Sequence, residues 1–320
     1  MSNEKPRLFD RKQLKTYPLS SRDSKMDIGQ LAKPPGKNPS FQDFLDALPP
    51  ILAGRSFKEV VEALRRALRK NRLILLGMGA HPIKCGLNPI LIDGMKKGWL
   101  KALALNGAGV IHDFEIACAG ITSEEVRDQI ADGSFGMAEE TGREINDAFK
   151  EGVAKGWGLG KAIGRYLNTK KPPHLEYSIT ATADRLGVPV SVHVAIGTDI
   201  IHMHPSCDGK VIGEGSYRDF LAFTELVKDL EGGGVYLNVG SAVLLPEVFL
   251  KAVSMVRNSG APLTDFTTVN FDFLQMYRPT ENVVKRPIIG TGKGYAITGH
   301  HEILIPMLAF ALSIEENEPS

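Results

Sequence analysis

The sequence predicts an α/β fold with a doubly wound, mostly parallel sheet, on the basis of two observations. Short, continuous apolar runs recur along the chain, as is typical of strands that are buried on both faces. Stretches with helical periodicity separate these runs, which is the alternation expected of parallel strands joined by crossover helices. The predicted strands are residues 72–79, 102–106, 188–195, 235–239 and 267–271. The predicted helices are residues 57–70, 122–150, 176–186, 217–229, 246–258 and 301–313.

Each element has a local justification. In the first helix, FKEVVEALRRALRK, the valines and leucines form one apolar stripe opposite lysines and arginines. The first strand, RLILLGMG, is an uninterrupted apolar run that ends in glycine, and the later strands repeat this pattern. The helix at 122–150 begins with Thr122 and Glu125, which have the spacing of a capping box. The later helices follow the same helical spacing of apolar residues.

The chain divides into an N-terminal arm, residues 1–40, and an α/β domain, residues 41–320. The arm is polar, contains five prolines and shows no sustained periodicity, so it is not expected to join the main core. A segment of this kind either stays mobile or docks on a partner subunit, and both alternatives remain open.

Composition excludes several classes of protein. The 38 Lys and Arg residues nearly balance the 37 Asp and Glu residues, which argues against nucleic acid or an anionic membrane as the main ligand. The charged start is unlike a secretory signal peptide, and the longest apolar stretch, residues 303–312, falls well short of the roughly 18 residues that span a bilayer. Three cysteines without CxxC spacing fit a reducing compartment, so we expect a cytoplasmic protein.

Glycines and polar side chains gather at the ends of the predicted strands. In parallel sheets, ligands bind beyond the carboxyl ends of the strands, where small residues let the backbone approach phosphate oxygens. Such clusters occur at residues 77–81, 106–109, 197–199 and 240–241, and a triple glycine precedes the fourth strand. No segment combines GxGxxG with an acidic residue about 20 positions later, so an ordinary dinucleotide-binding motif is not predicted.

Histidines are the second signal at these strand ends, where seven of the eight lie. They are His81, His112, His193, His202, His204, His300 and His301. Some of them could form a transition-metal site, but no HExxH or other defined ligand spacing is present. The alternative is that they are neutral hydrogen-bonding groups that line a cleft. On this ground we expect no metal ion.

Five segments in the same order along the chain resemble the deoxyhypusine synthase family. They are LNGAGVIHD at 105–113, EYSI at 176–179 with VPV at 188–190 and a following Thr-Asp, GGGV at 232–235, RPTENV at 278–283 and IPML at 305–308. The resemblance implies a Rossmann-type, NAD-binding domain that assembles as a homotetramer with active sites at a dimer interface. It also implies a transferase that oxidises spermidine with NAD, holds the aminobutyl group on a lysine and passes it to another amine.

The resemblance further implies a set of site residues. The cofactor-binding candidates are Asn106, Gly107, Gly109, Asp113, Thr198, Asp199, Gly232, Gly233 and Gly234. The catalytic candidates are Lys285, Glu281, His204 and His300. Only Glu281 comes from the resemblance, whereas Lys285 lies near the family lysine position and the two histidines lie at strand ends. Glu281 corresponds to the carboxylate that helps to bind the amine, and Thr198 or Asp199 would lie near a ribose. Histidines with a pKa near neutral could act as general acids or bases.

Several positions depart from the family pattern. The position of the imine-forming lysine holds Pro287, and Lys285 lies two residues earlier. A proline cannot form the imine, which argues against a true deoxyhypusine synthase. With fewer acids and more histidines, the predicted pocket suits a less cationic substrate, or one whose carboxylate or phosphate is held by Arg278, Arg286 or Lys285.

Three functional hypotheses therefore stay open. The first is an NAD-dependent enzyme of the aminoalkyl-transfer type that acts on an amine or amino-acid-like small molecule. The second is a hydrolase or lyase that uses the histidines, with or without a metal ion. The third is a catalytically silent relative that binds a nucleotide or a partner and works through its N-terminal arm. Both enzyme hypotheses require Asp113, Glu281, His204 and His300 to converge on one cleft.

Overall fold

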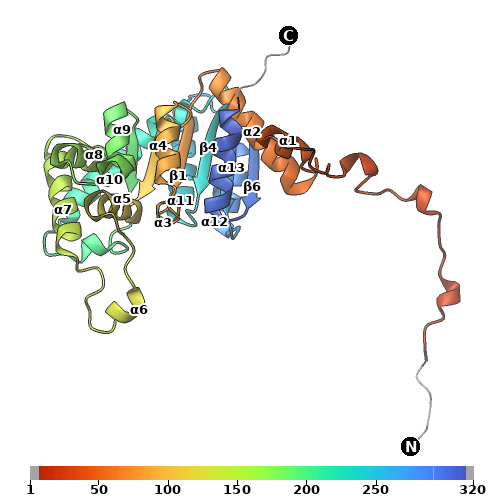
Figure 1. The fold of residues 1–320 in the computed structure, drawn as a ribbon, viewed down its shortest axis with the longest axis horizontal. Helices are drawn as coiled ribbons and strands as arrows, with labels where there is room; N and C mark the ends of the chain where they lie inside the picture. Colours follow the sequence, from red (N-terminus) through yellow and green to blue (C-terminus); the bar gives the residue numbers. More distant parts are fainter. Residues whose placement is uncertain (1–6, 291, 315–320) are drawn as a thin grey trace, which may run out of the picture.

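The computed structural model describes residues 7–290 and 292–314 and has a six-stranded, all-parallel sheet at its centre (Figure 1). The strand order is β3-β2-β1-β4-β5-β6, which confirms the predicted α/β fold. The strands are β1 (Ile74–Met78), β2 (Ala102–Asn106), β3 (Val190–His193), β4 (Gly234–Val239), β5 (Phe266–Asp272) and β6 (Lys293–Thr298). The order reverses between β1 and β4, so the connections leave these two neighbours in opposite directions.

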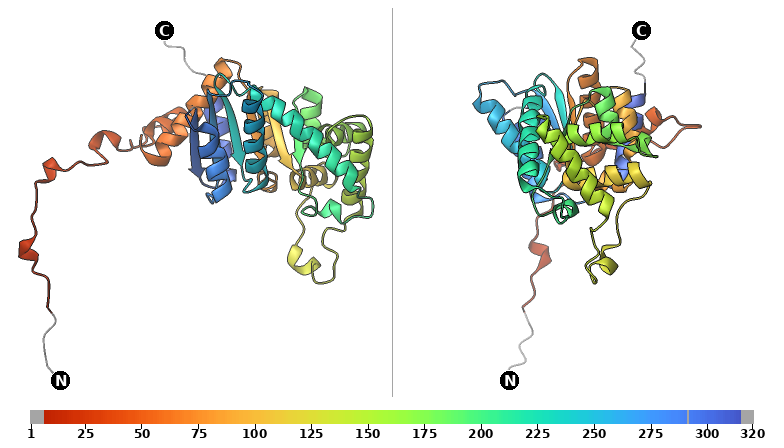
Figure 2. Two further views of the ribbon diagram at one scale, coloured as in Figure 1. Left: turned by 180° about the vertical axis from the view of Figure 1, so that it is seen from behind. Right: turned by 90° about the vertical axis from the view of Figure 1, so that its left-hand side faces the viewer.

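Helices cover both faces of the sheet (Figure 2). They are α1 (Phe41–Ala47), α2 (Leu52–Arg69), α3 (His81–Lys84), α4 (Asn88–Lys96), α5 (Gly107–Ala119), α6 (Val126–Gln129), α7 (Glu139–Ala154), α8 (Leu159–Lys170), α9 (Ile179–Leu186), α10 (Gly209–Lys228), α11 (Leu244–Asn258), α12 (Tyr277–Pro279) and α13 (His301–Ser313). A π-helical turn, η6 (Thr280–Lys285), follows α12, and a 3₁₀ turn, η5 (Ile200–His202), follows β3.

The core consists of two apolar clusters, one on each face of the sheet. Successive side chains of a strand point to opposite faces, and β1 shows this directly: Leu76 joins one cluster and Leu75 the other. The first cluster includes residues of α2, α4, α5 and α13, and the second includes residues of α10 and α11. All five residues of β1 are buried, as the uninterrupted apolar run predicts.

The structure corrects one predicted helix. Residues 122–150 do not form a single helix, because Gly133 and Gly136 adopt positive φ and the chain forms a projecting loop with the short helix α6 before α7 begins (Figure 1). Thr122 caps no helix and instead donates a hydrogen bond to Glu115. The strand β6 and the helices α1, α4, α5 and α8 were not predicted.

Residues 7–40 run away from the body of the protein with only short 3₁₀ turns, and none of them is buried (Figure 1). Large apolar side chains on this arm are exposed, such as Leu8, Leu19 and Ile28. The division at residue 40 stays a prediction. Within the described part of the chain, no helix has the length and apolar character that crossing a bilayer requires.

Candidate functional site

The carboxyl ends of β2 and β3 bring together four of the predicted cofactor-binding residues. Asn106 ends β2 and caps α5, because its side-chain oxygen accepts the Gly109 N–H at 2.9 Å. Gly107 follows at the first position of α5 and faces the Asp199 carboxylate, which a Cβ at residue 107 would overlap. The glycine therefore permits a buried carboxylate to lie against the N-terminus of this helix.

Asp199 is a buried acid of this region with an oxygen that accepts no hydrogen bond from the described residues. Its side chain is 6% exposed, and its Oδ2 atom has no hydrogen-bond partner. Burial raises the pKa of Asp199 to about 6, although the Ala108 N–H donates to the carboxylate and opposes this rise. A buried acceptor that no group of the protein satisfies is typical of a ligand site.

His202 faces the same carboxylate. Its Nδ1 atom accepts hydrogen bonds from the N–H groups of Gly197 and Asp199, at 3.1 and 3.2 Å. In a neutral imidazole this leaves the proton on Nε2, which lies 3.9 Å from Asp199 Oδ2 and also has no partner. Burial lowers the pKa of His202, which favours the neutral ring. An unpaired donor and an unpaired acceptor thus lie 3.9 Å apart, and Asp199 lines a cavity.

That cavity has a volume of about 230 Å³ and is lined by Asp199 and Thr198, one face of α5 and the projecting loop. A second cavity of about 600 Å³ adjoins it and is mainly apolar. The two cavities share Glu115, Ser123 and Glu124. The loop that contains α6 contributes lining residues to both of them, so this loop encloses a two-part site.

The lining of the two cavities is acidic. Four carboxylates, Glu115, Glu124, Glu140 and Asp199, contribute to it, against the two lysines Lys84 and Lys170. Burial of Glu115 opposes its ionisation, yet hydrogen bonds from His112, Thr122 and Thr141 hold its pKa below the usual range. Glu115 is therefore an anion at neutral pH, and it lies where the two cavities meet.

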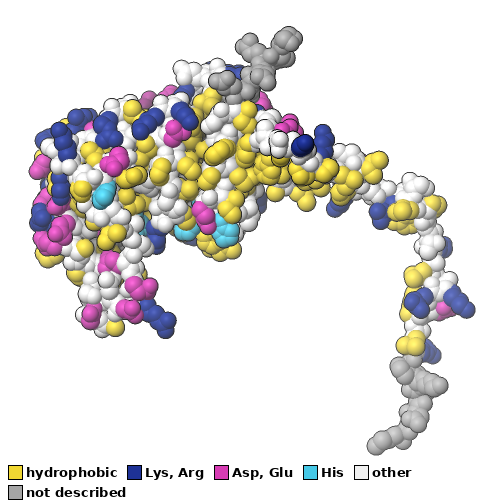
Figure 3. Space-filling model, viewed as in Figure 1, with side chains coloured by type: hydrophobic (Ala, Val, Ile, Leu, Met, Phe, Trp, Pro, Cys, Tyr) yellow, Lys and Arg dark blue, Asp and Glu magenta, His cyan; other side chains and the backbone are white. Residues whose placement is uncertain are grey.

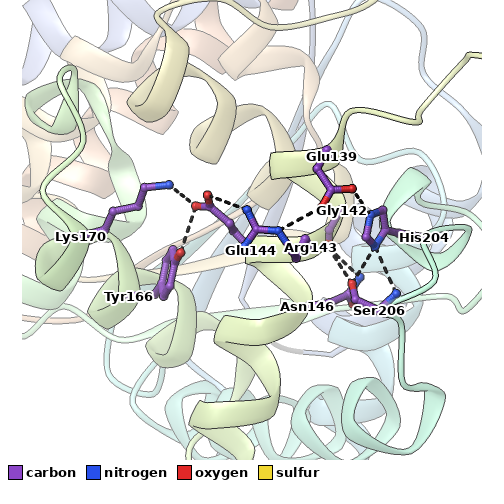
Figure 4. Close-up of polar contacts among 9 residues, drawn as sticks. All are labelled: Glu139, Gly142, Arg143, Glu144, Asn146, Tyr166, Lys170, His204 and Ser206. Carbon is purple, nitrogen blue, oxygen red and sulfur yellow. Dashed lines mark hydrogen bonds and ion pairs between the residues drawn. The ribbon is translucent and has the colours of Figure 1, made fainter.

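A chain of polar contacts runs from the larger cavity across α7 (Figure 4). Lys170 forms an ion pair with Glu144, which also accepts a hydrogen bond from Tyr166 at 2.9 Å. Arg143 contacts both Glu144 and Glu139, at 3.5 and 3.0 Å. Glu144 pairs with the positive charge of Lys170. The lining therefore carries more negative charge than a count of its residues suggests.

His204 belongs to this polar chain. Its Nε2 atom lies 3.2 Å from Glu139, and its Nδ1 atom lies 2.7 Å from the Ser206 hydroxyl (Figure 4). The ring also packs against Gly142, where a Cβ would overlap it. Its contacts connect the segment after β3 to α7, and His204 does not line either cavity.

Asp113 is fully buried but does not line the cavities. It accepts hydrogen bonds from the Ser178 hydroxyl at 2.8 Å, from the Ile179 N–H at 2.7 Å and from the Thr180 N–H and hydroxyl at 3.0 and 2.6 Å. These contacts attach α5 to the N-terminus of α9. The structure thus gives Asp113 a complete set of partners within the fold.

The triple glycine lies at the amino end of β4, on the side of the sheet away from the carboxyl ends of the strands. Gly232, Gly233 and Gly234 precede or begin β4, and a Cβ at the first two would approach Arg72 and Asp265. Gly232 and Gly233 adopt positive φ, so they form the tight turn that enters the strand. Because ligands of parallel sheets bind at the carboxyl ends, these glycines are not part of the site around Asp199.

Glu281 and Lys285 lie on η6, between β5 and β6. Their side chains pair at 2.7 Å, and that of Lys285 is 60% exposed. Hydrogen bonds from Lys285 lower the pKa of Glu281, which is partly opposed by burial. Arg278 pairs with Glu247, and Arg286 donates to Asn282 at 2.7 Å. These cations are engaged by their neighbours rather than gathered around an anion site.

His300 follows β6, at the edge of the sheet opposite to β3. Its side chain is 66% exposed, and its ring stacks on Phe273. The structure therefore does not bring Asp113, Glu281, His204 and His300 to one cleft, so these four residues give neither enzyme hypothesis a geometric basis. A proposal of function has to rest on the residues around Asp199 instead. Within the described residues, no group of three or more histidine, cysteine or acidic side chains is arranged to hold a metal ion.

Some lining residues were missed in the sequence, although one signal was present. Ala108, Ile111 and Glu115 all line the smaller cavity and recur at the spacing of one face of a helix. Since this helix starts at a predicted ligand-binding end, the face that carries these three residues indicates the site. Glu124, Lys84 and Lys170 carry no comparable local signal.

No family model matches the chain, and no curated protein matches it. Among solved structures, the ternary complex of AgrE with ornithine and NAD⁺ has a TM-score of 0.54, with 14% identity over 82% of this chain and 34% of AgrE. Unliganded AgrE has a TM-score of 0.52, with 14% identity over 82% of this chain and 33% of AgrE. A putative deoxyhypusine synthase from Entamoeba histolytica has a TM-score of 0.49, with 9% identity over 86% of this chain and 93% of that chain.

The chain thus spans about a third of the length of AgrE. At this level of identity, the likeness establishes the α/β fold and nothing finer.

Proposed function

We propose that this protein is an NAD-dependent enzyme that acts on an amine or amino-acid-like substrate in the two-part acidic cavity. The observation that carries the proposal is Asp199, which lines that cavity and whose buried Oδ2 atom has no hydrogen-bond partner among the described residues. By the sequence resemblance, we further propose aminoalkyl transfer as the reaction type and a homotetramer as the assembly.

Two residues of the smaller cavity, Asp199 and Lys84, fit a dinucleotide. Ribose hydroxyls are hydrogen-bond donors, and Asp199 Oδ2 is an unpaired acceptor of the kind that binds them. The N-terminus of α5 is less suited to phosphate, because the Gly109 and Ala108 N–H groups already bind Asn106 and Asp199. We therefore assign the phosphate contact to Lys84, an exposed lysine in the lining of the smaller cavity. NAD, when bound, supplies a hydride acceptor.

The acidic lining fits a cationic substrate. Glu115 and Glu124 lie where the two cavities meet, and the larger cavity has the apolar walls that suit an alkyl chain. An ammonium group at Glu115 and an alkyl chain along Phe114 would satisfy both features. This replaces the expectation of an anionic substrate held by Arg278, Arg286 or Lys285. The complex of AgrE with ornithine and NAD⁺ supports the proposal, since AgrE, which this chain resembles in fold over 34% of AgrE, binds both kinds of ligand.

The proposal is tested by calorimetric titration of NAD⁺ into the wild type, Asp199→Asn and Gly107→Ala. We expect binding to the wild type and at least a tenfold loss in both variants. Gly213→Ala is the matched control, because a Cβ at residue 213 of α10 meets no atom within 4 Å. Absence of binding to the wild type, or unchanged binding in both site variants, would contradict the proposal.

A second measurement addresses the substrate class. Wild-type protein with NAD⁺ is incubated with putrescine, spermidine, ornithine and arginine, and reduced cofactor and new amine products are followed by absorbance and mass spectrometry. Turnover that Glu115→Gln reduces would support an amine substrate at this carboxylate. Activity confined to anionic compounds would exclude it.

A further inference from the structure

Two histidines from opposite ends of the domain form a pair at the point where the strand order reverses. His81 begins α3 directly after β1, and His301 begins α13 after β6. Their Nδ1 atoms lie 2.8 Å apart, and the His301 side chain is completely buried. Gly240, at the end of β4, leaves room for this ring, since a Cβ there would lie 2.7 Å from His301 Cε1.

The position of each proton in this pair follows from its hydrogen bonds. His301 Nε2 lies 3.1 Å from the carbonyl oxygen of Phe271, which can only accept, so this nitrogen carries a proton. In the neutral ring, His301 Nδ1 is then an acceptor, and His81 Nδ1 must donate across the 2.8 Å contact. His81 is left with an unprotonated Nε2 atom. Burial lowers the pKa of His301, which is consistent with its neutral state.

Two carboxylates lie near the pair. When His81 takes up a proton, the bond from its Nδ1–H to His301 becomes charge-assisted. Asp272 lies 4.0 Å from His301 Nε2, and Glu302 is near both rings. His81 Nδ1 is held by His301, and His301 Nε2 is held by the carbonyl oxygen of Phe271. This is the organisation of a catalytic base and its orienting residue.

Cys85 does not serve as the partner of this base. Its sulfur lies 3.4 Å from Nδ1 and 3.5 Å from Nε2 of His81, so it lies about equally far from both nitrogens. Burial, together with Glu302, raises the pKa of the Cys85 thiol, which keeps it protonated at neutral pH. Among the described residues, no other side chain forms a hydrogen bond with His81 Nε2, so this atom is available to an external partner.

The base is accessible from solvent. His81 is half-buried, and its ring lies beside Phe273, which is 45% exposed and stacks on His300. Figure 3 shows histidine side chains next to hydrophobic ones at this end of the sheet. Lys84, at the other end of the short helix α3, lines the smaller cavity, so the pair lies close to the proposed site.

We infer that His81 is a general base that removes a proton from a substrate hydroxyl or N–H group, and that His301 is its positioning residue. The proton moves to His81 Nε2, and the electron pair of the broken bond stays on the substrate oxygen or nitrogen. No further reactant is needed for this step. The inference does not depend on NAD binding and can hold if the proposed function fails.

Diethyl pyrocarbonate, which acylates unprotonated imidazole nitrogens, tests the inference with the full-length protein. Reaction rates of individual histidines are measured by peptide mass spectrometry at neutral pH. We expect His81 to react several-fold faster than His300, although exposure alone predicts the reverse. His301→Ala should slow His81 below His300, whereas the control His174→Gln should leave the order unchanged. Faster reaction of His300 in the wild type would overturn the inference.

The tautomers provide a test that needs no variant. Nitrogen-15 NMR of the wild-type rings should show a proton on Nδ1 of His81 and on Nε2 of His301. The opposite tautomer of His81 would overturn the inference, even if His301→Ala fails to fold.

Discussion

Two buried aspartates, one in the middle of α5 and one that packs against the N-terminus of this helix, lie in very different surroundings. At the junction of α5 with α9, Asp113 accepts four hydrogen bonds from three consecutive residues. At the N-terminus of α5, Asp199 accepts the Ala108 N–H, and one of its oxygens has no partner. Burial raises the pKa of both carboxylates, but only Asp113 has hydrogen bonds from the chain to both of its oxygens. The difference distinguishes an acid that stabilises the fold from one that is available to a ligand.

The largest expected effect on stability is that of replacing Asp113, the aspartate with hydrogen bonds to both oxygens. Asp113→Ala leaves the donors of Ser178, Ile179 and Thr180 buried without an acceptor, so we expect a loss of about 3–5 kcal/mol in the free energy of unfolding. Urea denaturation measures it. A loss below about 1 kcal/mol would show that the junction does not depend on this carboxylate.

Asp199→Asn should change the pH dependence of stability. Because burial raises the pKa of Asp199 to about 6 in the folded protein, the unfolded chain loses this proton first as the pH rises. The protonated acid therefore makes its full contribution to the free energy of unfolding below about pH 4, and this contribution is lost as the pH rises to about 6.

Relative to Asp199→Asn, the wild type should thus lose on the order of 2 kcal/mol between pH 4 and pH 7. Denaturant titrations of both proteins across this range measure the difference. Parallel stability curves would mean that Asp199 is not strained by burial.

Gly107→Ala tests the close approach of α5 to Asp199. The added methyl group overlaps the carboxylate, so we expect a loss of about 1–2 kcal/mol in stability. In the control Gly213→Ala, the methyl group enters open space and the helix should gain up to about 1 kcal/mol. Equal effects in thermal unfolding would argue that residue 107 has room for a side chain.

The smallest effect is expected at the exposed ion pair of η6. Lys285→Ala removes a contact to Glu281 that solvent largely screens, so the stability should change by less than about 0.5 kcal/mol. Chemical denaturation at low and high salt checks this value. A loss above about 1 kcal/mol would mean that this pair is coupled to more of the structure than its exposure indicates.

Much of the fold could be predicted because it depends on local apolar patterns. The runs at β1, β2, β4 and β5 are buried on both faces and therefore continuous in the sequence. β6, KGYAIT, escaped prediction because it is an edge strand with mostly exposed or half-buried residues. The helix at 122–150 failed because two glycines with positive φ lie inside its periodic pattern.

The site was predicted only where it coincides with a strand end. Asn106, Gly107, Thr198 and Asp199 follow predicted strands, and the parallel sheet brings them together at one edge. Glu281 and Lys285 were chosen from a resemblance in sequence, which says nothing about their exposure or pairing. Their mutual contact became visible only in the folded chain.

By itself, the sequence determined the parallel α/β sheet and the edge at which ligands are expected, because burial patterns and strand-end glycines are local properties. Only the tertiary structure decided which polar groups are satisfied. Asp113 and Asp199 are both aspartates next to apolar runs. Asp113 has hydrogen-bond partners 65 or more residues away, whereas Asp199 Oδ2 has no partner among the described residues. The contact of His81 with His301, across 220 residues, is of the same kind. Hydrogen bonding between distant segments is set by how the chain packs, and no local pattern encodes it.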